Sequence, residues 1–185
     1  SLQNNPGYLG NEGIDVKESS RNGKVHHNYI HDFPTEGGAI YVDAWTAGLN
    51  GTPSLSDIEI YNNIVEDAGS IVIGAERGGT AENIKIYNNL VVNCPDTGIG
   101  ISNTGIANAP NGNGLRRNIE IYNNTIYKTR WNGGAGIFIK SANIINIVIR
   151  NNITYINKSN GQIIVAVPSA LSQIKADHNL VFGSK

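Results

Sequence analysis

A six-residue pattern, Ile-x-Ile-Tyr-Asn-Asn, recurs along this chain and constrains its fold more than any other feature. Three copies are nearly identical, at residues 58–63, 84–89 and 119–124, and weaker copies flank them. The second asparagine of the pattern recurs at Asn28, Asn63, Asn89, Asn124, Asn152 and Asn179. A repeat in the high twenties of residues, lengthened twice by about eight residues, is typical of a solenoid in which each unit packs on its neighbours.

Each repeat contains two further short β patterns. One follows the asparagine pair directly, as in residues 64–67, and the other comes a few residues later, as in residues 70–73 and 98–101. Apolar residues alternate with other residues in these patterns, which places Ile and Val on one face of each strand. Apolar residues do not recur every 3.6 residues, as they would in an amphipathic helix. The sequence therefore predicts an all-β fold: a right-handed parallel β-helix of about six to seven coils with three short strands per coil, as one domain over residues 1–185.

The repeated asparagine requires a physical reason, because Asn is normally depleted in strands. Coils stacked about 4.8 Å apart would place these asparagines directly above one another. Their amides could then form a ladder in one turn that also satisfies backbone groups of that turn. The two insertions, at residues 47–56 and 104–114, are rich in Gly, Pro, Asn and Thr, and we expect them to be loops that grow out of a coil.

Composition narrows the possible partners. A formal net charge of −1 offers no basic face for a phosphate backbone, so we expect no nucleic-acid partner. The single cysteine, Cys94, has no disulfide partner in the chain and is expected to be a buried apolar thiol. No apolar run is long enough to span a bilayer and residues 1–10 lack the features of a signal peptide, so we expect no membrane partner.

At these repeats, from residues 12–15 to residues 179–181, the chain resembles the right-handed parallel β-helix superfamily that includes pectate lyases, other polysaccharide lyases, several glycoside hydrolases and alginate epimerases. The resemblance implies a carbohydrate-active protein that is extracellular or on the cell surface, in a bacterium. Its partner would be an acidic plant or algal polysaccharide, or an oligosaccharide. The resemblance is specific for the fold and not for the activity, because many chemistries share this scaffold.

Many members of this superfamily have an amphipathic helix that caps the N-terminal coil, and the sequence shows none. An uncapped coil exposes an apolar cross-section and unpaired strand edges. We therefore expect the 185 residues either to be a fragment of a longer chain or to associate end to end.

The outer face of the coils is where function is expected, because the interior of a β-helix is packed. Aligning the coils places outward-facing Asp15 beside Tyr41, and Lys17 beside Asp43. Polar side chains concentrate on these first coils, next to the insertion at residues 47–56. The candidate site consists of Glu12, Asp15, Lys17, Tyr41, Asp43, Trp45, Glu76 and Arg77.

Elimination from a uronic acid needs a cation that neutralises the carboxylate and a base that removes the proton on C5. Asp15, Asp43 and Glu76 are hard oxygen ligands suited to Ca²⁺. Lys17 or Arg77 is the candidate base, as basic residues are in lyases of the resembling superfamily. Lys17 is the easier choice because burial near a cation lowers a lysine pKa more readily than an arginine pKa. The remaining candidates are expected to bind the sugar: Glu12, Tyr41 and Trp45.

Other interpretations of the same residues remain open. Lys17 and Asp43 could form a surface ion pair worth under about 1 kcal/mol. Asp43 and Glu76 could be the carboxylate pair of a glycoside hydrolase. The protein could also be a carbohydrate-binding or structural solenoid without catalytic activity.

Two further groups of outward residues are visible in the alignment. A second polar cluster ranks below the first, because histidine on a solvated face is more often inert than catalytic; it contains His26, His27, His31, Asp32, Glu66 and Asp67. A column along the Ile-x-Ile strands is expected to stack its side chains and stiffen the sheet, with sugar binding as the alternative. That column contains His26, Tyr61, Tyr87, Tyr122, Arg150 and Asp177.

Overall fold

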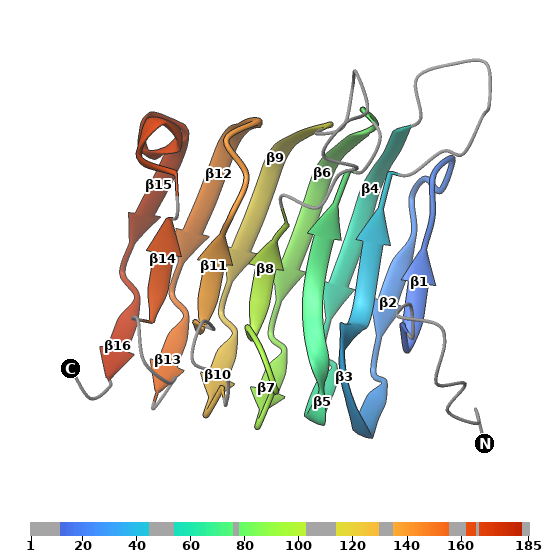
Figure 1. Cartoon of the computed structure of the whole chain (residues 1–185), viewed down its shortest axis with the longest axis vertical. Helices are drawn as coiled ribbons and strands as arrows, with labels where there is room; N and C mark the ends of the chain where they lie inside the picture. The colour runs from blue at the N-terminus through green and yellow to red at the C-terminus, as the bar shows by residue number, and fades with distance from the viewer. Residues whose placement is uncertain are drawn as a thin grey trace.

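The parallel β-helix predicted from the repeat is confirmed. The computed structural model describes residues 12–44, 54–75, 78–102, 114–129, 135–155, 162–165 and 167–182. Every strand pair in these ranges is parallel, and the strands form two sheets that face each other across the core (Figure 1). The chain passes from one sheet to the other in each coil, so neighbouring strands of a sheet come from successive coils.

The six-stranded sheet contains the Ile-x-Ile pattern. Its members, in spatial order, are β2 (Lys24–His26), β4 (Ser54–Tyr61), β6 (Thr80–Tyr87), β9 (Leu115–Tyr122), β12 (Ile144–Arg150) and β15 (Ile174–Asp177). Equivalent residues of the repeat lie directly opposite each other, as Tyr61 does with Tyr87 and Tyr87 with Tyr122. The register therefore agrees with the alignment made from the asparagines.

The ten-stranded sheet contains the other two β patterns of each coil as two arms. The β8 arm consists of β1 (Ile14–Val16), the second halves of β3 (Tyr29–Asp43) and β5 (Ile64–Gly74), then β8 (Ile99–Ile101), β11 (Ile137–Ile139) and β14 (Ile163–Val165). The β7 arm consists of the first halves of β3 and β5, then β7 (Leu90–Val92), β10 (Thr125–Tyr127), β13 (Ile153–Tyr155) and β16 (Leu180–Phe182). Together with the six-stranded sheet, the two arms provide the expected three strand positions per coil.

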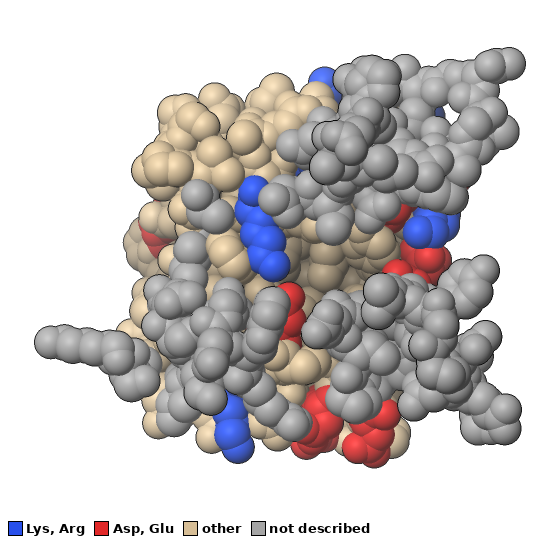
Figure 2. Space-filling view, viewed as in Figure 1, with Lys and Arg blue, Asp and Glu red and all other residues tan. Residues whose placement is uncertain are grey.

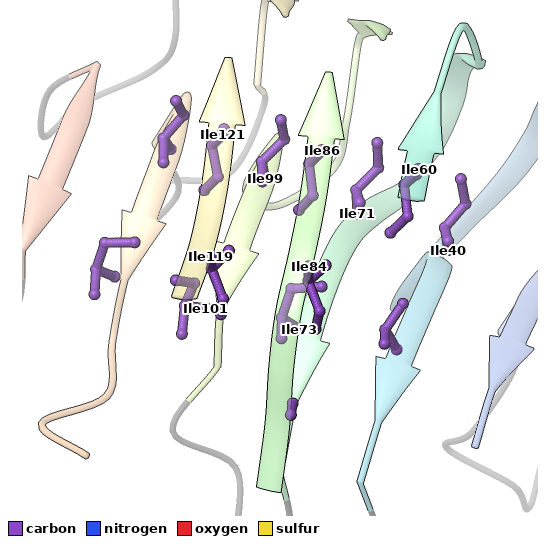
Figure 3. Packing of buried hydrophobic residues seen from close by; sticks show 14 of the residues in the cluster. Ile40, Ile60, Ile71, Ile73, Ile84, Ile86, Ile99, Ile101, Ile119 and Ile121 are labelled. Carbon is purple, nitrogen blue, oxygen red and sulfur yellow. The ribbon is translucent and has the colours of Figure 1, made fainter. Parts of the chain in front are cut away.

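Columns of isoleucine fill the space between the sheets. Ile84 and Ile86 point inward from the six-stranded sheet, and Ile71 and Ile73 point toward them from the β8 arm (Figure 3). All four are fully buried, and the same positions in the next coil are again isoleucine. Burial of each such side chain stabilises the fold by about 1.5–3 kcal/mol. The stacked coils thus share one continuous apolar core.

The asparagine pair of each repeat builds the turn between the two sheets. The first asparagine adopts the left-handed conformation, with φ of 53° at Asn62, 55° at Asn88 and 55° at Asn123, which Asn tolerates better than most residues. The second asparagine points inward and bonds to its counterpart in the next coil, as Asn89 Nδ2 does to Asn124 Oδ1 at 2.9 Å. The predicted ladder is confirmed.

The structure differs from the sequence prediction in how the strands begin and end. The second and third β patterns join into single long strands in β3 and β5. The insertion expected at residues 47–56 ends earlier, because β4 already begins at Ser54; residues 47–53 and 104–113 lie outside the described ranges. A short 3₁₀ helix, η1 (Pro168–Gln173), precedes β15.

In the described residues, no helix is both long and apolar enough to cross a bilayer.

Cys94 is fully buried, and burial raises the pKa of its thiol to about 12. Because the thiolate is the reactive species, we expect native protein at pH 8 to resist thiol reagents such as Ellman's reagent. One thiol per chain should react after unfolding in denaturant. Rapid labelling of the native protein would contradict the buried position.

Candidate functional site

The first coils bring four of the candidate residues together on the outer side of the β8 arm. Asp15 lies in β1 directly opposite Tyr41 in β3, as the alignment predicted. Lys17 follows β1, and Asp43 ends β3. Figure 2 shows basic and acidic side chains next to each other on this face, near the place of β1 in Figure 1.

A single ammonium group joins the two carboxylates of this cluster. Lys17 Nζ lies 3.1 Å from Asp15 Oδ2 and 3.5 Å from Asp43 Oδ2. The same nitrogen lies 5.4 Å from the centre of the Tyr41 ring, which is within the range of a cation–π contact. Two adjacent coils therefore contribute acidic groups to one cation.

The two carboxylates differ sharply in exposure. The Asp43 side chain is 1% exposed, whereas the Asp15 side chain is 30% exposed. Tyr41 and Asp43 lean over Gly74 of the next coil, where a Cβ atom would lie 2.6 Å from Tyr41 Oη and 2.8 Å from Asp43 Oδ1. Only glycine at this position leaves room for both side chains.

This close approach gives a test of the cluster that leaves its side chains unchanged. Gly74→Ala is expected to displace Tyr41 and Asp43, and so to weaken binding of any ligand at the cluster by about tenfold or more. Gly100→Ala is the matched control, because a Cβ there meets no atom closer than 3.8 Å. Equal affinities of the two variants, measured by calorimetry, would show that the cluster does not depend on this packing.

The charge state of Lys17 follows from its surroundings. Burial lowers the pKa of Lys17, but its hydrogen bond to Asp15 and the negative charges of Asp15 and Asp43 raise it, and the net pKa lies above the usual lysine value. Lys17 is therefore a cation at neutral pH. A cation suits neutralisation of a substrate carboxylate, whereas a base must first lose its proton. The role of Lys17 as the base stays a prediction that this pKa does not favour.

The predicted Ca²⁺ ligands are only partly described. Asp15 and Asp43 lie within reach of one cation, and hard carboxylate oxygens are what Ca²⁺ prefers. Glu76, the third predicted ligand, lies outside the described ranges. Among the residues that are described, no three His, Cys, Asp or Glu side chains converge as a metal site. Lys17 Nζ lies between Asp15 and Asp43, so a calcium site at these carboxylates stays a prediction.

Of the remaining candidates, Glu12 is the one within the described ranges. Glu12 is half-buried and lies two residues before β1. Trp45 and Arg77, like Glu76, lie outside the described ranges. Farther along the same face, Lys140 lies 3.8 Å from Asp96 and 4.8 Å from the centre of the Phe138 ring. A second lysine over an aromatic ring therefore lies on this side of the molecule.

The second polar cluster divides into local pairs. His31 Nδ1 lies 2.9 Å from Asp32 Oδ2, and Tyr29 donates its hydroxyl to Glu66 Oε2 at 2.6 Å. His31 and Glu66 are register partners in β3 and β5, as predicted, although Glu66 accepts its hydrogen bond from Tyr29. Each pair is exposed, so these contacts offer little electrostatic activation.

The aromatic column is confirmed as a stack. Tyr61, Tyr87 and Tyr122 stack with ring centres 4.9 and 5.0 Å apart and planes within 5° of parallel. His26 extends the stack at one end, and the Arg150 guanidinium lies 5.3 Å from the Tyr122 ring at the other. Because the ring faces are turned toward one another, only ring edges face solvent. Sugar rings need an exposed aromatic face, so this geometry favours the structural interpretation.

Sequence reasoning missed a second ladder beside this stack. Asn118 Nδ2 donates to Asn83 Oδ1 at 3.1 Å, Asn83 Nδ2 donates to Asp57 Oδ1 at 3.1 Å, and Asn146 continues the chain of contacts. All four residues have φ between 53° and 59°. Asp57, Asn83 and Asn118 border a shallow hollow of about 460 Å³ on the outside of the six-stranded sheet. The signal was present as Asp or Asn one residue before each Ile-x-Ile pattern.

A buried arginine was also missed. Arg116 in β9 is fully buried and donates from Nη1 to the Gly114 carbonyl at 2.8 Å and to Ser141 Oγ at 3.3 Å. It occupies an inward position, because its register partners in the neighbouring coils are Ala81 and Ile144. The residue three positions before the first isoleucine is apolar in the neighbouring patterns and is Arg116 in this one. Aligning this position across the repeats would have revealed a charged residue in an apolar column.

Comparison of the chain with protein-family models, with curated proteins and with solved structures found no match. The coil geometry and the residues on its surface are therefore the grounds on which a function can be argued.

Proposed function

We propose that this is a secreted, carbohydrate-active β-helix protein related to the pectate-lyase-like superfamily, and that Asp15, Lys17, Tyr41 and Asp43 bind an acidic polysaccharide. The burial of Asp43 is the observation that supports this most strongly. An outward-facing carboxylate on a solenoid can remain in water, and its burial costs several kcal/mol unless charged or hydrogen-bonding groups compensate. A 1% exposed carboxylate paired with Lys17 on the outer face is thus the kind of buried charged group that gathers at functional sites.

The substrate class follows from the charge at the most exposed point of the cluster. The Lys17 side chain is 43% exposed and is a cation at neutral pH. Its ammonium can exchange part of its contact with Asp15 for a uronate carboxylate, while the buried Asp43 keeps it in place. Neutral sugars would gain nothing from this exchange, so the site favours an acidic chain.

The reaction that best fits such a complex is β-elimination. The proton on C5 of the uronic acid passes to a base, its electron pair forms the C4–C5 double bond, and the C4–O glycosidic bond breaks with its electrons on the leaving oxygen. Lys17 would neutralise the uronate carboxylate and so acidify the C5 proton, and Arg77 is the remaining candidate base. Ca²⁺ bound at Asp15 and Asp43 would add positive charge beside the same carboxylate.

Binding without cleavage is the second candidate, and the raised pKa of Lys17 favours it. A lysine that keeps its proton binds an anion well but removes a proton poorly. In that case the cluster would hold the polysaccharide and leave it intact.

Incubation with pectin, alginate and rhamnogalacturonan separates these functions. A lyase should release unsaturated products, visible as ultraviolet absorbance, and a chelator should slow the reaction if Ca²⁺ takes part. Retention of the protein by immobilised polygalacturonate without any absorbance change would leave binding as the function. Absence of both signals on all three acidic polysaccharides would contradict the proposal.

A further inference from the structure

Exposed apolar side chains cover the outer side of four strands of the β7 arm. Strands β7, β10, β13 and β16 lie side by side (Figure 1), and none of them contains a charged residue. The middle residues Val91, Ile126 and Thr154 are fully buried, so the first and third residues of each strand point outward. These outward residues form what we call the apolar face: Leu90, Val92, Thr125, Tyr127, Ile153, Tyr155, Leu180 and Phe182.

The register of the strands makes the apolar face continuous. The first residues of the four strands are register partners in turn, and so are the third residues. The six largest side chains of the face are each between 36% and 50% exposed. Single exposed apolar residues are normal on a protein surface, whereas a contiguous group of them marks a contact with another molecule.

Polar residues border the apolar face. Lys128 follows β10 and is exposed, and toward the first coils the register partner of Val92 is Glu66. Along the opposite border lie exposed residues of the turns in the left-handed conformation, Asn88, Asn123, Asn151 and His178. An apolar centre with a polar rim is the usual composition of a protein–protein interface.

The chemistry of the face favours another sheet as its partner. A sugar would need exposed aromatic faces, but Tyr127 and Tyr155 turn theirs toward each other, with ring centres 5.5 Å apart and planes within 15° of parallel. An uncharged sheet face packs well against a second one at a separation of about 10 Å. A second copy of this chain offers such a face without any repulsion between like charges. We infer that the apolar face is an isologous interface between two copies of this chain.

A two-fold axis that relates two facing sheets lies in the plane of contact. An axis parallel to the strands keeps the strand direction and reverses the order of the coils. Placed between β10 and β13, this axis sets β10 over β13 of the second copy and β7 over β16 of the second copy. Tyr127 then meets Tyr155 of the second copy, and Leu90 meets Leu180 of the second copy. No charged side chain of the four strands enters the contact.

An axis parallel to the stacking direction of the coils fits less well. It keeps the order of the coils and reverses the strands, so every coil of the arm overlaps and the first outward residue of each strand meets the third. Ile64 of one copy would then cover Glu66 of the other, and burial of that carboxylate is unfavourable. The axis parallel to the strands leaves β5 and Glu66 outside the overlap. It also leaves out β1 and β3, which carry the candidate site, so this inference does not rest on the proposed function.

The size of the face predicts a weak dimer. A large side chain has about 200 Å² of surface, so six of them at 36–50% exposure present roughly 500 Å² per copy. Burial of about 1,000 Å² in total lies at the lower limit for a specific interface, and we expect a dissociation constant in the micromolar range. Because the contact is apolar, association should not weaken between about 50 and 500 mM salt.

Two isoleucines in the same outward column provide a matched test. Ile153 is 40% exposed and lies inside the overlap, whereas Ile64 is 42% exposed... and lies in β5, outside it. Ile153→Lys should weaken self-association by about a hundredfold, because it places an unpaired ammonium in the apolar contact at two symmetric points. Ile64→Lys should change it by less than about threefold. Sedimentation velocity over a range of concentrations measures both variants and the wild type.

Further measurements keep the test decisive. Leu90→Lys places the charge in a different strand of the overlap and should weaken association as Ile153→Lys does, and circular dichroism should show that each variant keeps its fold. The inference is overturned if the wild type stays monomeric up to about 1 mM, or if both Ile153→Lys and Leu90→Lys associate like the wild type. Stronger association of Ile64→Lys would overturn the axis parallel to the strands, because the other axis places this lysine over Glu66 of the second copy.

Discussion

Replacing Asn124 by alanine is expected to lower the free energy of unfolding by about 3–5 kcal/mol. The Asn124 side chain is 1% exposed and lies in the middle of the ladder. Its Nδ2 lies 2.9 Å from the Ile86 carbonyl and 3.0 Å from Asn152 Oδ1, and its Oδ1 accepts from Asn89 N and Nδ2 at 3.0 and 2.9 Å. Alanine would leave these buried groups without the partner that Asn124 supplies, at about 1–3 kcal/mol for each group that finds no other.

Asn28 offers a matched control, because it is the first residue of the same ladder. It is half-exposed, and its Nδ2 donates to Asn63 Oδ1 at 2.9 Å. Asn28→Ala should cost about 1 kcal/mol, since water can replace the lost contacts. Urea denaturation of both variants measures the difference. Similar losses for the two substitutions would mean that the ladder contributes through its turns and not through its buried amides.

Replacing Lys17 by methionine is expected to weaken binding of an acidic polysaccharide by about a hundredfold, or about 2.7 kcal/mol. Methionine keeps much of the length of the side chain but removes the cation that lies between Asp15 and Asp43. The remaining carboxylates would then repel a uronate. If the protein cleaves its substrate, turnover should fall at least as far, because neutralisation of the uronate is needed for loss of the C5 proton.

Lys140→Met is the control for this substitution. Lys140 lies on the same side of the molecule, also beside an acidic residue and over an aromatic ring, but three coils away from Asp43. Its replacement should change affinity by less than about threefold. Equal losses in the two variants, measured by calorimetry with oligogalacturonate, would point to general attraction of anions and not to a site at Lys17.

The pH dependence of binding provides an independent measure of the same contact. The pKa of Lys17 is raised, so its ammonium persists throughout the neutral range and disappears only as the pH rises through that raised value. Affinity for an acidic chain should therefore stay constant from about pH 6 to pH 9 and fall at higher pH. A loss of affinity centred near neutral pH would assign the contact to another group.

Much of the fold could be predicted because a parallel solenoid repeats its environment. Ile84 and Ile119 are buried neighbours for the same reason that Asn89 and Asn124 are hydrogen-bonded neighbours: each pair lies one coil apart in register. The tyrosine stack followed from the same rule. Strand ends were less predictable, since β3 continues through residues whose composition is typical of a corner.

The candidate site was predictable only as a list of neighbours. Register alone placed Asp15 opposite Tyr41. It could not show that Asp43 is buried while Asp15 is half-exposed, because burial depends on how Tyr41 and Asp43 fold over Gly74. The sequence analysis predicted a lowered pKa for Lys17 as a catalytic base, on the expectation that a cation lies beside it. In the structure, two carboxylates lie beside Lys17 and raise its pKa.

The amino-acid sequence by itself determined the repeat, the inward and outward faces, and which residues of successive coils are neighbours, because parallel strands stack like positions on like positions. Only the tertiary structure decided how deeply each outward side chain is buried and which charges share a contact. It also decided that a hollow bordered by left-handed residues such as Asp57 and Asn83 lies on the same face as the tyrosine stack. These properties depend on distances across coils of a few ångströms, which a one-dimensional pattern does not contain.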